Sequence, residues 1–324
     1  MKALVTGGGG YLGSAVVRAL LQRGDGVISL QRGDYPALQQ PGIQAVRGDI
    51  AAADSVVRAA QGCDVVYHVA GKTGIWGRYA DYHHTNVAGT ENVILACREN
   101  GVRALVYTSS PSVVFDGRDE AGIDESVPYP EHFYNHYQQT KAEAEQMVLA
   151  ANGNGLATLA LRPHLIWGPG DPHLIGRIVD RARAGKLKLI NARNRVDTTY
   201  IDNAAAAHLL GADALITNDK CRGKAYFISN GEPVVLSELI NRILAAKRLP
   251  PVTSYVSPGL AYLVGAVTET LYGLLGKQDE PMMTRFVARQ LSCEHWFDIS
   301  AARRDLGYTP TVTIDQGLER LRDA

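Results

Sequence analysis

The chain has 324 residues, and its 33 Lys and Arg residues balance 33 Asp and Glu residues, so the formal net charge is zero. A chain of about two ordinary domain lengths can bury a sizeable core. The balanced charge provides no overall basic field for nucleic acid or anionic lipid, so we expect neither a nucleic-acid partner nor a generally basic surface.

Cysteine usage and hydropathy indicate the cellular compartment and argue against a disulfide framework, a zinc site and a transmembrane span. The four cysteines are scattered without a C-x-x-C pair, as is typical of reduced thiols rather than disulfides or a zinc site. The longest apolar stretch, residues 259–276, contains Thr268, Glu269 and Thr270, which argues against a transmembrane span. Residues 259–276 are compatible with three interpretations: a substrate lid, a dimer contact or an interfacial helix. We predict a cytoplasmic protein without a signal peptide or metal site.

Residues 1–165 alternate strand-like and helix-like patterns. Apolar runs predict strands at residues 3–5, 26–30, 43–46, 64–68, 104–107 and 157–161, and helical patterns occupy residues 12–23, 81–100 and 137–151. Such alternation predicts a doubly wound parallel sheet, an α/β Rossmann domain. Over residues 166–324 the strand pattern fades, so we predict a smaller, mainly helical substrate lobe with some segments returning to the sheet.

The first predicted strand leads directly into a glycine-rich segment, TGGGGYLG at residues 6–13. Its glycines at 7, 10 and 13 suit a tight turn, a close backbone approach to a pyrophosphate and close helix–strand packing. The amides and the positive end of the helix dipole would then hold the anion. This strand–loop–helix setting predicts a dinucleotide site.

The end of the second predicted strand indicates which dinucleotide binds. NAD-binding loops of this kind place a carboxylate there to bond the ribose hydroxyls, whereas this chain reads Gln31-Arg32. A guanidinium can grip a 2′-phosphate, so Arg32 favours NADP(H). Asp49, after the third strand, is placed to accept from the adenine amino group or to cap a helix.

Tyr137 and Lys141, in the segment YQQTK, share one face of a predicted helix. A free phenol has a pKa near 10, and a neighbouring ammonium would lower it, making Tyr137 a general acid or base. Ser109 and Ser110 follow the strand at 104–107, at the edge where such sheets bind ligands. A serine there can hold the substrate oxygen.

Together the TGGGGYLG loop, the serine and the Tyr137–Lys141 pair resemble the extended short-chain dehydrogenase/reductase family. The resemblance implies Ser110 as the catalytic serine, with Ser109 as the fallback, beside Tyr137 and Lys141. It also implies that Lys141 holds the nicotinamide ribose and that residues 163–166 line the nicotinamide. Cofactor contacts are then expected at Gly7, Gly10, Tyr11, Leu12, Gly13, Arg32, Asp49, Ile50, Ala70, Tyr137, Lys141 and Pro163.

Longer segments are similar to the 3β-hydroxysteroid-dehydrogenase-like branch, and within it to the 2-alkyl-3-oxoalkanoate reductases of bacterial long-chain olefin biosynthesis. They are QRGDYP (31–36), LRPHLIWGPGD (161–171), TYIDNA (199–204), GKAYFISNGEP (223–233) and ARRDLGY (302–308). The resemblance implies an NADPH-dependent reduction of a long-chain β-keto acid to the 3-hydroxy acid. It also implies a homodimer and contacts with other enzymes of the olefin pathway.

Several alternatives remain open at this stage. A 3β-hydroxysteroid or sterol-carboxylate dehydrogenase would share the fold and the catalytic residues, and a nucleotide-sugar epimerase or a non-catalytic NADPH sensor fits less well. The carboxylate of a keto acid would need a cation, for which Arg162, His164 and Arg193 are candidates.

Overall fold

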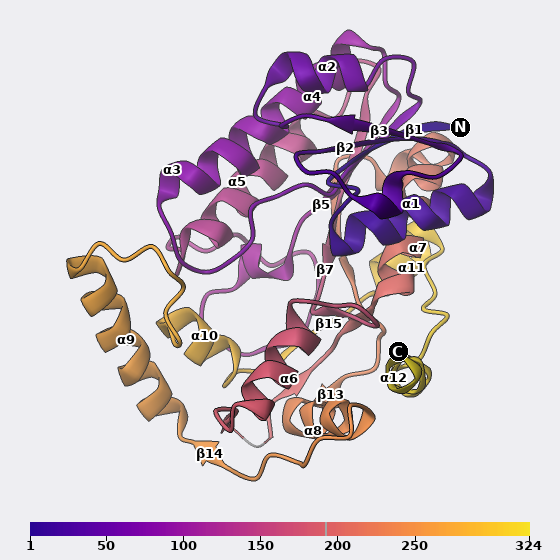
Figure 1. Cartoon of the computed structure of the whole chain (residues 1–324). Helices are drawn as coiled ribbons and strands as arrows, with labels where there is room; N and C mark the ends of the chain where they lie inside the picture. Colours follow the sequence, from indigo (N-terminus) through magenta and orange to yellow (C-terminus); the bar gives the residue numbers. More distant parts are fainter. Residues whose placement is uncertain (192) are drawn as a thin grey trace.

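The computed structural model describes residues 1–191 and 193–324, and a seven-stranded sheet forms its centre (Figure 1). The strand order is β12-β7-β5-β4-β1-β2-β3, and every neighbouring pair is parallel. The strands are β1 (Lys2–Thr6), β2 (Gly26–Gln31), β3 (Ile43–Arg47), β4 (Val65–His68), β5 (Ala104–Thr108), β7 (Ala157–Pro163) and β12 (Lys224–Ile228). This order confirms the predicted doubly wound α/β sheet.

Helices cover both faces of the sheet because its strands are apolar on both sides. In β1, Ala3 and Val5 join one hydrophobic core, while Leu4 joins the other. The first core also takes side chains of α1 (Tyr11–Arg23) and α7 (Ile201–Thr217). The second takes those of α2 (Ala53–Ala59), α4 (Gly89–Glu99) and α5 (His136–Ala150).

The helix predicted over residues 81–100 is irregular. It consists of α3 (Tyr79–Tyr82), a π-helical turn (His83–Ala88) and then α4. Inside that turn the Asn86 side chain bonds both the amide and the carbonyl of Lys72, and it also donates to Thr140. The π-helical turn thus positions the Asn86 side chain, which holds the loop after β4 against α5.

Residues beyond β7, together with the earlier strand β6, build a second part of the fold around a four-stranded sheet of order β13-β10-β15-β6. These strands are β6 (Glu120–Ile123), β10 (Arg195–Val196), β13 (Val234–Val235) and β15 (His295–Phe297). The helices of this part are α6 (Leu174–Arg183), α8 (Leu236–Ala246), α9 (Pro258–Leu274), α10 (Arg285–Gln290), α11 (Ser300–Leu306) and α12 (Ile314–Asp323).

Short elements complete the connections. They are the 3-10 turns at Pro36–Leu38, Pro111–Val114 and Asp219–Cys221, the two-stranded pair of β8 (Ile166–Trp167) with β11 (Thr199–Tyr200), and that of β9 (Leu189–Ile190) with β14 (Tyr255–Val256). Segments from each side of residue 165 contribute to the sheet formed mainly by the other side. β6 leaves the first half for the second sheet, while α7 and β12 of the second half pack on or extend the central one.

Within residues 1–191 and 193–324, we find no helix with the length and apolar character needed to cross a bilayer. In the same residues no group of three or more His, Cys, Asp and Glu side chains could hold a metal ion. The four cysteines are buried and free.

Candidate active site

The glycine loop forms a close-packed cradle between β1 and α1. Gly7 has a φ of 73°, which favours glycine, and a Cβ there would lie 2.9 Å from the backbone of Ala70. A Cβ on Gly13 would come within 2.1 Å of the Gly7 carbonyl oxygen. Thr6 fixes Ala70 beside this turn by accepting its amide at 3.2 Å. The loop therefore tolerates no side chain at positions 7 or 13.

The first turn of α1 is ready to receive an anion. Gly10 supplies no side-chain cap, and the turn carries no acidic residue. Its amides and the positive end of the helix dipole are left for a ligand such as a pyrophosphate. Of the predicted contacts in this turn, Leu12 is buried in the core and the Tyr11 ring packs against that core, so both would use their backbone amides.

The predicted adenosine contacts lie where β2 and β3 end. Arg32 is exposed, and Asp49 accepts the amide of Ala51 at 3.0 Å, so one carboxylate oxygen already serves a turn. Ile50 is buried beside Gly89. Sequence reasoning missed Tyr35, whose ring lies over Gly9: a Cβ on that glycine would sit 2.3 Å from ring carbons.

Ser110 and Tyr137 meet at the carboxyl edge of the sheet. The pKa of the Tyr137 phenol is raised by burial, and a side-chain hydrogen bond with Ser110 acts against that rise. The Ser110 oxygen accepts from the amide of Ser112 at 3.3 Å and from its hydroxyl at 3.0 Å. Its own proton is then free to be donated, which stabilises a phenolate or a substrate oxygen.

The neighbouring serine is placed differently. The Ser109 hydroxyl is buried, and no described residue is its hydrogen-bond partner, while its amide bonds the Leu161 carbonyl across to β7. Of the two serines, Ser110 is thus the one that the structure brings to the tyrosine.

Two residues that flank Tyr137, Asn135 and Gln138, hold the start of α5 in place, and the sequence analysis assigned a role to neither. Asn135 caps the helix by accepting the Gln138 amide at 2.8 Å. The Gln138 side chain reaches back to the Tyr134 amide and across to the Phe115 carbonyl. An Asn three residues ahead of a Gln at a helix start is the capping signal that could have revealed them.

Lys141 differs from the expectation. Its ammonium donates to the Thr108 carbonyl oxygen at 2.5 Å and lies 4.1 Å from the centre of the Tyr107 ring. Burial lowers its pKa to about 7. The sequence predicted that this cation would lower the Tyr137 pKa, but in this structure burial raises the pKa of Tyr137 and the opposing contact comes from Ser110.

Of the three candidate cations for the substrate carboxylate, Arg162 is already paired with a carboxylate of the protein. It lies buried and donates to both oxygens of Glu145, at 3.0 Å from Nε and 2.6 Å from Nη2. His164 follows Pro163 at the end of β7, and its Nδ1 lies 2.8 Å from a carboxylate oxygen of Asp197. Asp197 also accepts the amide of Phe297, so the carboxylate that orients this imidazole is itself fixed.

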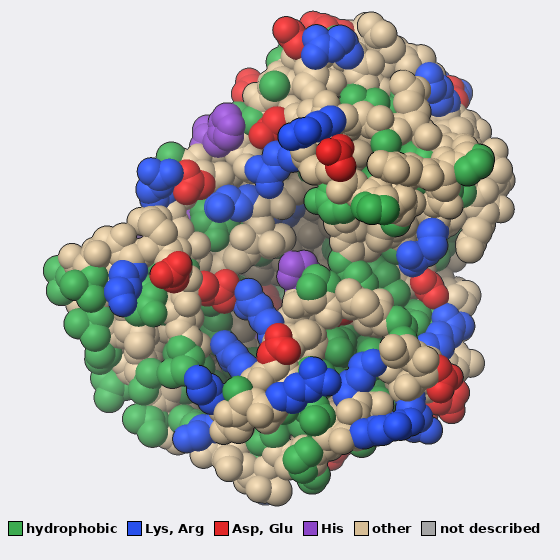
Figure 2. Space-filling model, in the orientation of Figure 1, with side chains coloured by type: hydrophobic (Ala, Val, Ile, Leu, Met, Phe, Trp, Pro, Cys, Tyr) green, Lys and Arg blue, Asp and Glu red, His purple; other side chains and the backbone are tan. Residues whose placement is uncertain are grey.

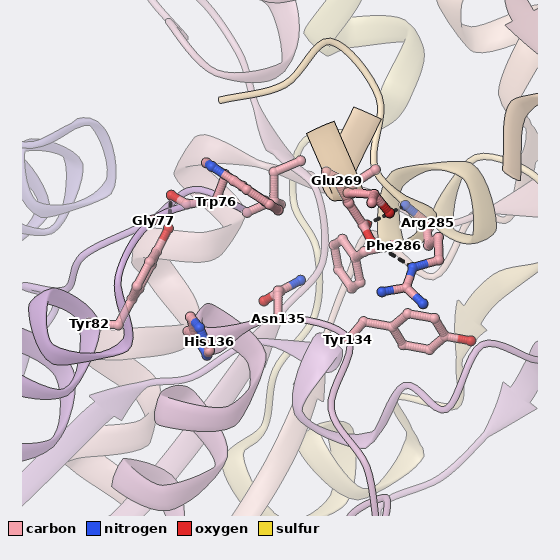
Figure 3. A pocket seen from close by; sticks show the side chains of 12 residues that line it. Trp76, Gly77, Tyr82, Tyr134, Asn135, His136, Glu269, Arg285 and Phe286 are labelled. Atoms are coloured by element: carbon pink, nitrogen blue, oxygen red, sulfur yellow. Dashed lines mark hydrogen bonds and ion pairs between the residues drawn. The ribbon is translucent and has the colours of Figure 1, made fainter. Parts of the chain in front are cut away.

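A cavity of about 400 Å³ adjoins the start of α5 (Figure 3). Tyr134, Asn135 and His136 line it directly ahead of Tyr137. Across from them, α9 supplies Glu269 and Thr270, and α10 supplies Arg285 and Phe286. Arg285 is bonded to Glu269 at 2.5 Å, so this cation is paired. The rest of the wall is largely aromatic and aliphatic: Ile75, Trp76 and Tyr82.

The parallel sheet, the glycine cradle and the residues gathered at its carboxyl edge define the class: an oxidoreductase that acts at a CH–OH or C=O group. The model of the 3-beta hydroxysteroid dehydrogenase/isomerase family matches residues 4–251, and the chain belongs to this family. The predicted family resemblance is thereby confirmed.

Individual relatives extend the match over nearly the whole chain. The 2-alkyl-3-oxoalkanoate reductase of Shewanella oneidensis is 53% identical, with 99% of this chain and 85% of the relative covered. The protein of the same name from Stenotrophomonas maltophilia is 52% identical over 99% and 98% of the two chains. A 3beta-hydroxysteroid-dehydrogenase/decarboxylase of Arabidopsis thaliana is 38% identical, covering 89% of this chain and 68% of its own.

Solved structures show the same fold. MoeE5 in complex with UDP-glucose and NAD superposes with a TM-score of 0.77 at 23% identity, covering 100% of this chain and 98% of that one. The structure of gox2253 gives a TM-score of 0.79 at 26% identity over 98% and 96%.

Proposed function

We propose that this protein is an NADPH-dependent ketoreductase that reduces a long-chain 2-alkyl-3-oxoalkanoate to the 2-alkyl-3-hydroxyalkanoate. The observation that carries the proposal is the side-chain hydrogen bond between Ser110 and Tyr137, next to a cavity whose wall is partly aromatic and aliphatic. Two relatives named 2-alkyl-3-oxoalkanoate reductase, at 53% and 52% identity over almost the full chain, support the substrate class.

The residues divide the work as follows. The bound dinucleotide would supply a hydride to carbon 3 of the substrate. Tyr137 gives its phenolic proton to the oxygen that becomes the alcohol, and Ser110 donates a hydrogen bond to the same oxygen. Lys141 donates to the Thr108 carbonyl at the same edge of the sheet. From this position its ammonium would bond the nicotinamide ribose.

The glycine cradle and α1 would hold the pyrophosphate, with Gly7, Gly10 and Gly13 admitting the backbone approach and Pro163 and Ala70 flanking the nicotinamide half. Arg32 supports NADP(H) over NAD(H), because an exposed guanidinium, and not a carboxylate, occupies the position directly after β2. Because Arg162 is paired, His164, which Asp197 orients, and the exposed Arg193 are the remaining candidate partners for the substrate carboxylate.

The aromatic and aliphatic part of the cavity wall next to the start of α5 suits an alkyl chain. Burial of each methylene contributes about 0.8 kcal/mol, so a few carbons against Ile75, Trp76 and Phe286 would add substantially to binding. We further propose a homodimeric cytoplasmic enzyme that works with other enzymes of olefin biosynthesis, which must supply the β-keto acid and consume the hydroxy acid.

The decisive experiment follows NADPH oxidation with a 2-alkyl-3-oxo acid, in parallel with NADH. Tyr137→Phe should remove most turnover and leave NADPH affinity nearly unchanged, because the variant loses only the transferable proton. Tyr79→Phe, an exposed tyrosine outside the cavity wall, is the matched control. Full activity in Tyr137→Phe would exclude the mechanism. Tight NADPH binding without turnover on the keto acid would redirect the assignment to 3β-hydroxysteroids.

A further inference from the structure

The side chain of Asn135 leaves one hydrogen-bond donor unused, two residues ahead of Tyr137. Its oxygen Oδ1 accepts the amide of Gln138 at 2.8 Å and so caps α5. Its nitrogen Nδ2 is buried and has no hydrogen-bond partner among the described residues. Because only an oxygen can accept from an amide N–H, the bond to Gln138 fixes which end of the side chain is the NH2 group. The unpaired atom is therefore a donor.

This donor belongs to a residue in the wall of the cavity beside the start of α5. Figure 3 shows the Asn135 side chain projecting into the space between Trp76 and Phe286. Of the side chains that line the cavity in residues 1–191 and 193–324, Asn135 is the one with a buried polar atom that lacks a partner. A buried donor without an acceptor destabilises the fold. We therefore expect a ligand in this cavity to present an acceptor to Asn135.

The charges of the cavity wall leave room for an anionic acceptor. Glu269 is the single acidic residue among the described lining side chains, and it is bonded to both the amide and the guanidinium of Arg285. The first turn of α5 contains no acidic residue, and Asn135 and His136 at its start line the cavity. The positive end of the helix dipole thus adjoins the cavity, and no unpaired carboxylate of the described wall repels an incoming anion.

The surroundings of the site also carry positive charge. Figure 2 shows the molecule hollowed between the part that contains α5 and the part that contains α6 and α10 in Figure 1, with Lys and Arg side chains on both sides of the hollow. Although the chain is neutral overall, cations placed around a hollow favour the approach of an anion. The chemistry that fits the free donor of Asn135 is therefore a carboxylate.

We propose that Nδ2 of Asn135 donates a hydrogen bond to the substrate carboxylate and thereby selects acids over neutral ketones. The inference rests on the proposed function and deepens it by naming a residue that recognises the acid. In a 3-oxo acid a single carbon separates the carboxylate from the carbonyl carbon, so the carboxylate has to bind next to Tyr137 and Ser110. Asn135 stands two residues ahead of Tyr137 at the same helix start. The amide is neutral, so it acts together with a cation and does not replace one.

Two substitutions separate the capping role of Asn135 from the proposed binding role. Asp is as good an N-cap as Asn, so Asn135→Asp keeps the oxygen that holds Gln138 while a carboxylate replaces the donor. Asn135→Ser also keeps a capping oxygen, and it removes the amide nitrogen without adding charge. Asn154→Asp, at an exposed asparagine in the loop after α5, adds the same charge outside the cavity wall and is the matched control.

The test is calorimetric binding of a 2-alkyl alkanoic acid and of its methyl ester to the protein loaded with the oxidised dinucleotide that the parent binds more tightly. The parent should bind the acid more tightly than the ester. Asn135→Ser should weaken binding of the acid about tenfold, and Asn135→Asp at least as much, because a donor to a charged group is lost. Binding of the ester should change by no more than about threefold, since a neutral hydrogen bond contributes less. Asn154→Asp should bind both compounds as the parent does.

Steady-state reduction of the 3-oxo acid and of its methyl ester gives a second readout. In Asn135→Asp the KM for the acid should rise at least about tenfold, because the lost contact and the added charge act on the carboxylate. The kcat for the ester should stay within about threefold of the parent value, because Tyr137 and Ser110 are unchanged.

Urea unfolding of each variant establishes that the cap of α5 is retained. The proposal is overturned if the parent does not prefer the acid to the ester, or if Asn135→Asp binds the acid as tightly as the parent does. Equal losses for acid and ester also overturn it, because a merely structural role of Asn135 predicts that result. A parent that binds the acid through Asn135 but reduces no 3-oxo acid would refute the proposed reaction and support the role of Asn135, so the two failures are distinguishable.

Discussion

The titration of Lys141 predicts how the free energy of unfolding depends on pH, and a substitution of this lysine tests that prediction. The ammonium is buried, and burial lowers its pKa from 10.5 to about 7, whereas in the unfolded chain the pKa returns to its ordinary value. Between these two values the unfolded state binds more protons than the folded state. The free energy of unfolding of the parent protein therefore rises with pH through this window, and below pH 7 the full cost of burying the charge is present.

Lys141→Met removes the charge and hence this dependence. With the two pKa values above, the advantage of the variant over the parent should shrink by about 3 kcal/mol between about pH 7 and about pH 9.5. The methionine also loses the bond to the Thr108 carbonyl, which costs about 1–3 kcal/mol but does not change the slope.

The measurement is urea unfolding of both proteins, followed by tryptophan fluorescence at several pH values. Taking the difference between parent and variant cancels every other titrating group. Lys188→Met, at an exposed lysine, serves as the control and should give a difference independent of pH. A flat difference for Lys141→Met would refute the reasoning, because the lysine would then be solvated in the folded protein.

Four further substitutions test the site and the ion pair that supports it. Ser110→Ala should lower kcat roughly 100-fold or more through loss of a donor to the forming alcohol oxygen, whereas Ser109→Ala should retain most activity; steady-state kinetics giving the reverse order would transfer the role to Ser109. Arg32→Ala should weaken NADPH binding at least about tenfold and leave NADH within about twofold by calorimetry, and equal losses would contradict the NADP(H) preference. Glu145→Gln should destabilise the fold by about 3–5 kcal/mol in urea unfolding, because it strands the Arg162 charge, and an unchanged midpoint would show that the pair is dispensable.

The fold could be predicted from the sequence because its signals are local. Apolar runs and the glycine loop mark β1, α1 and the strands that follow. The alternation of strands with helices along the chain then indicates a parallel sheet. The π-helical turn around Asn86 was not predictable in the same way. It depends on a side chain that bonds the backbone of Lys72, fourteen residues away, and helical periodicity does not report such contacts.

The site was predictable as a set of residues but not as an arrangement. Spacing placed Tyr137 and Lys141 on one helix face, yet the direction of the ammonium is decided by the Thr108 carbonyl and the Tyr107 ring on β5. Arg162 was a reasonable candidate for a substrate carboxylate until Glu145 of α5 was seen to hold it. Both outcomes rest on contacts between distant segments, which single-sequence patterns do not encode.

The position of β12 in the sheet has a consequence for synthesis on the ribosome. β7 is buried along all seven residues, and one of its two neighbours, β12, pairs Ile228 with Pro163. Until residue 228 has left the ribosome, the nascent sheet ends in an uncovered hydrophobic strand. At about 5–20 residues per second that interval lasts roughly 3–13 s, long enough for aggregation or chaperone binding to compete with folding. The nucleotide-binding half therefore cannot mature ahead of the rest, and the two halves must complete their fold together.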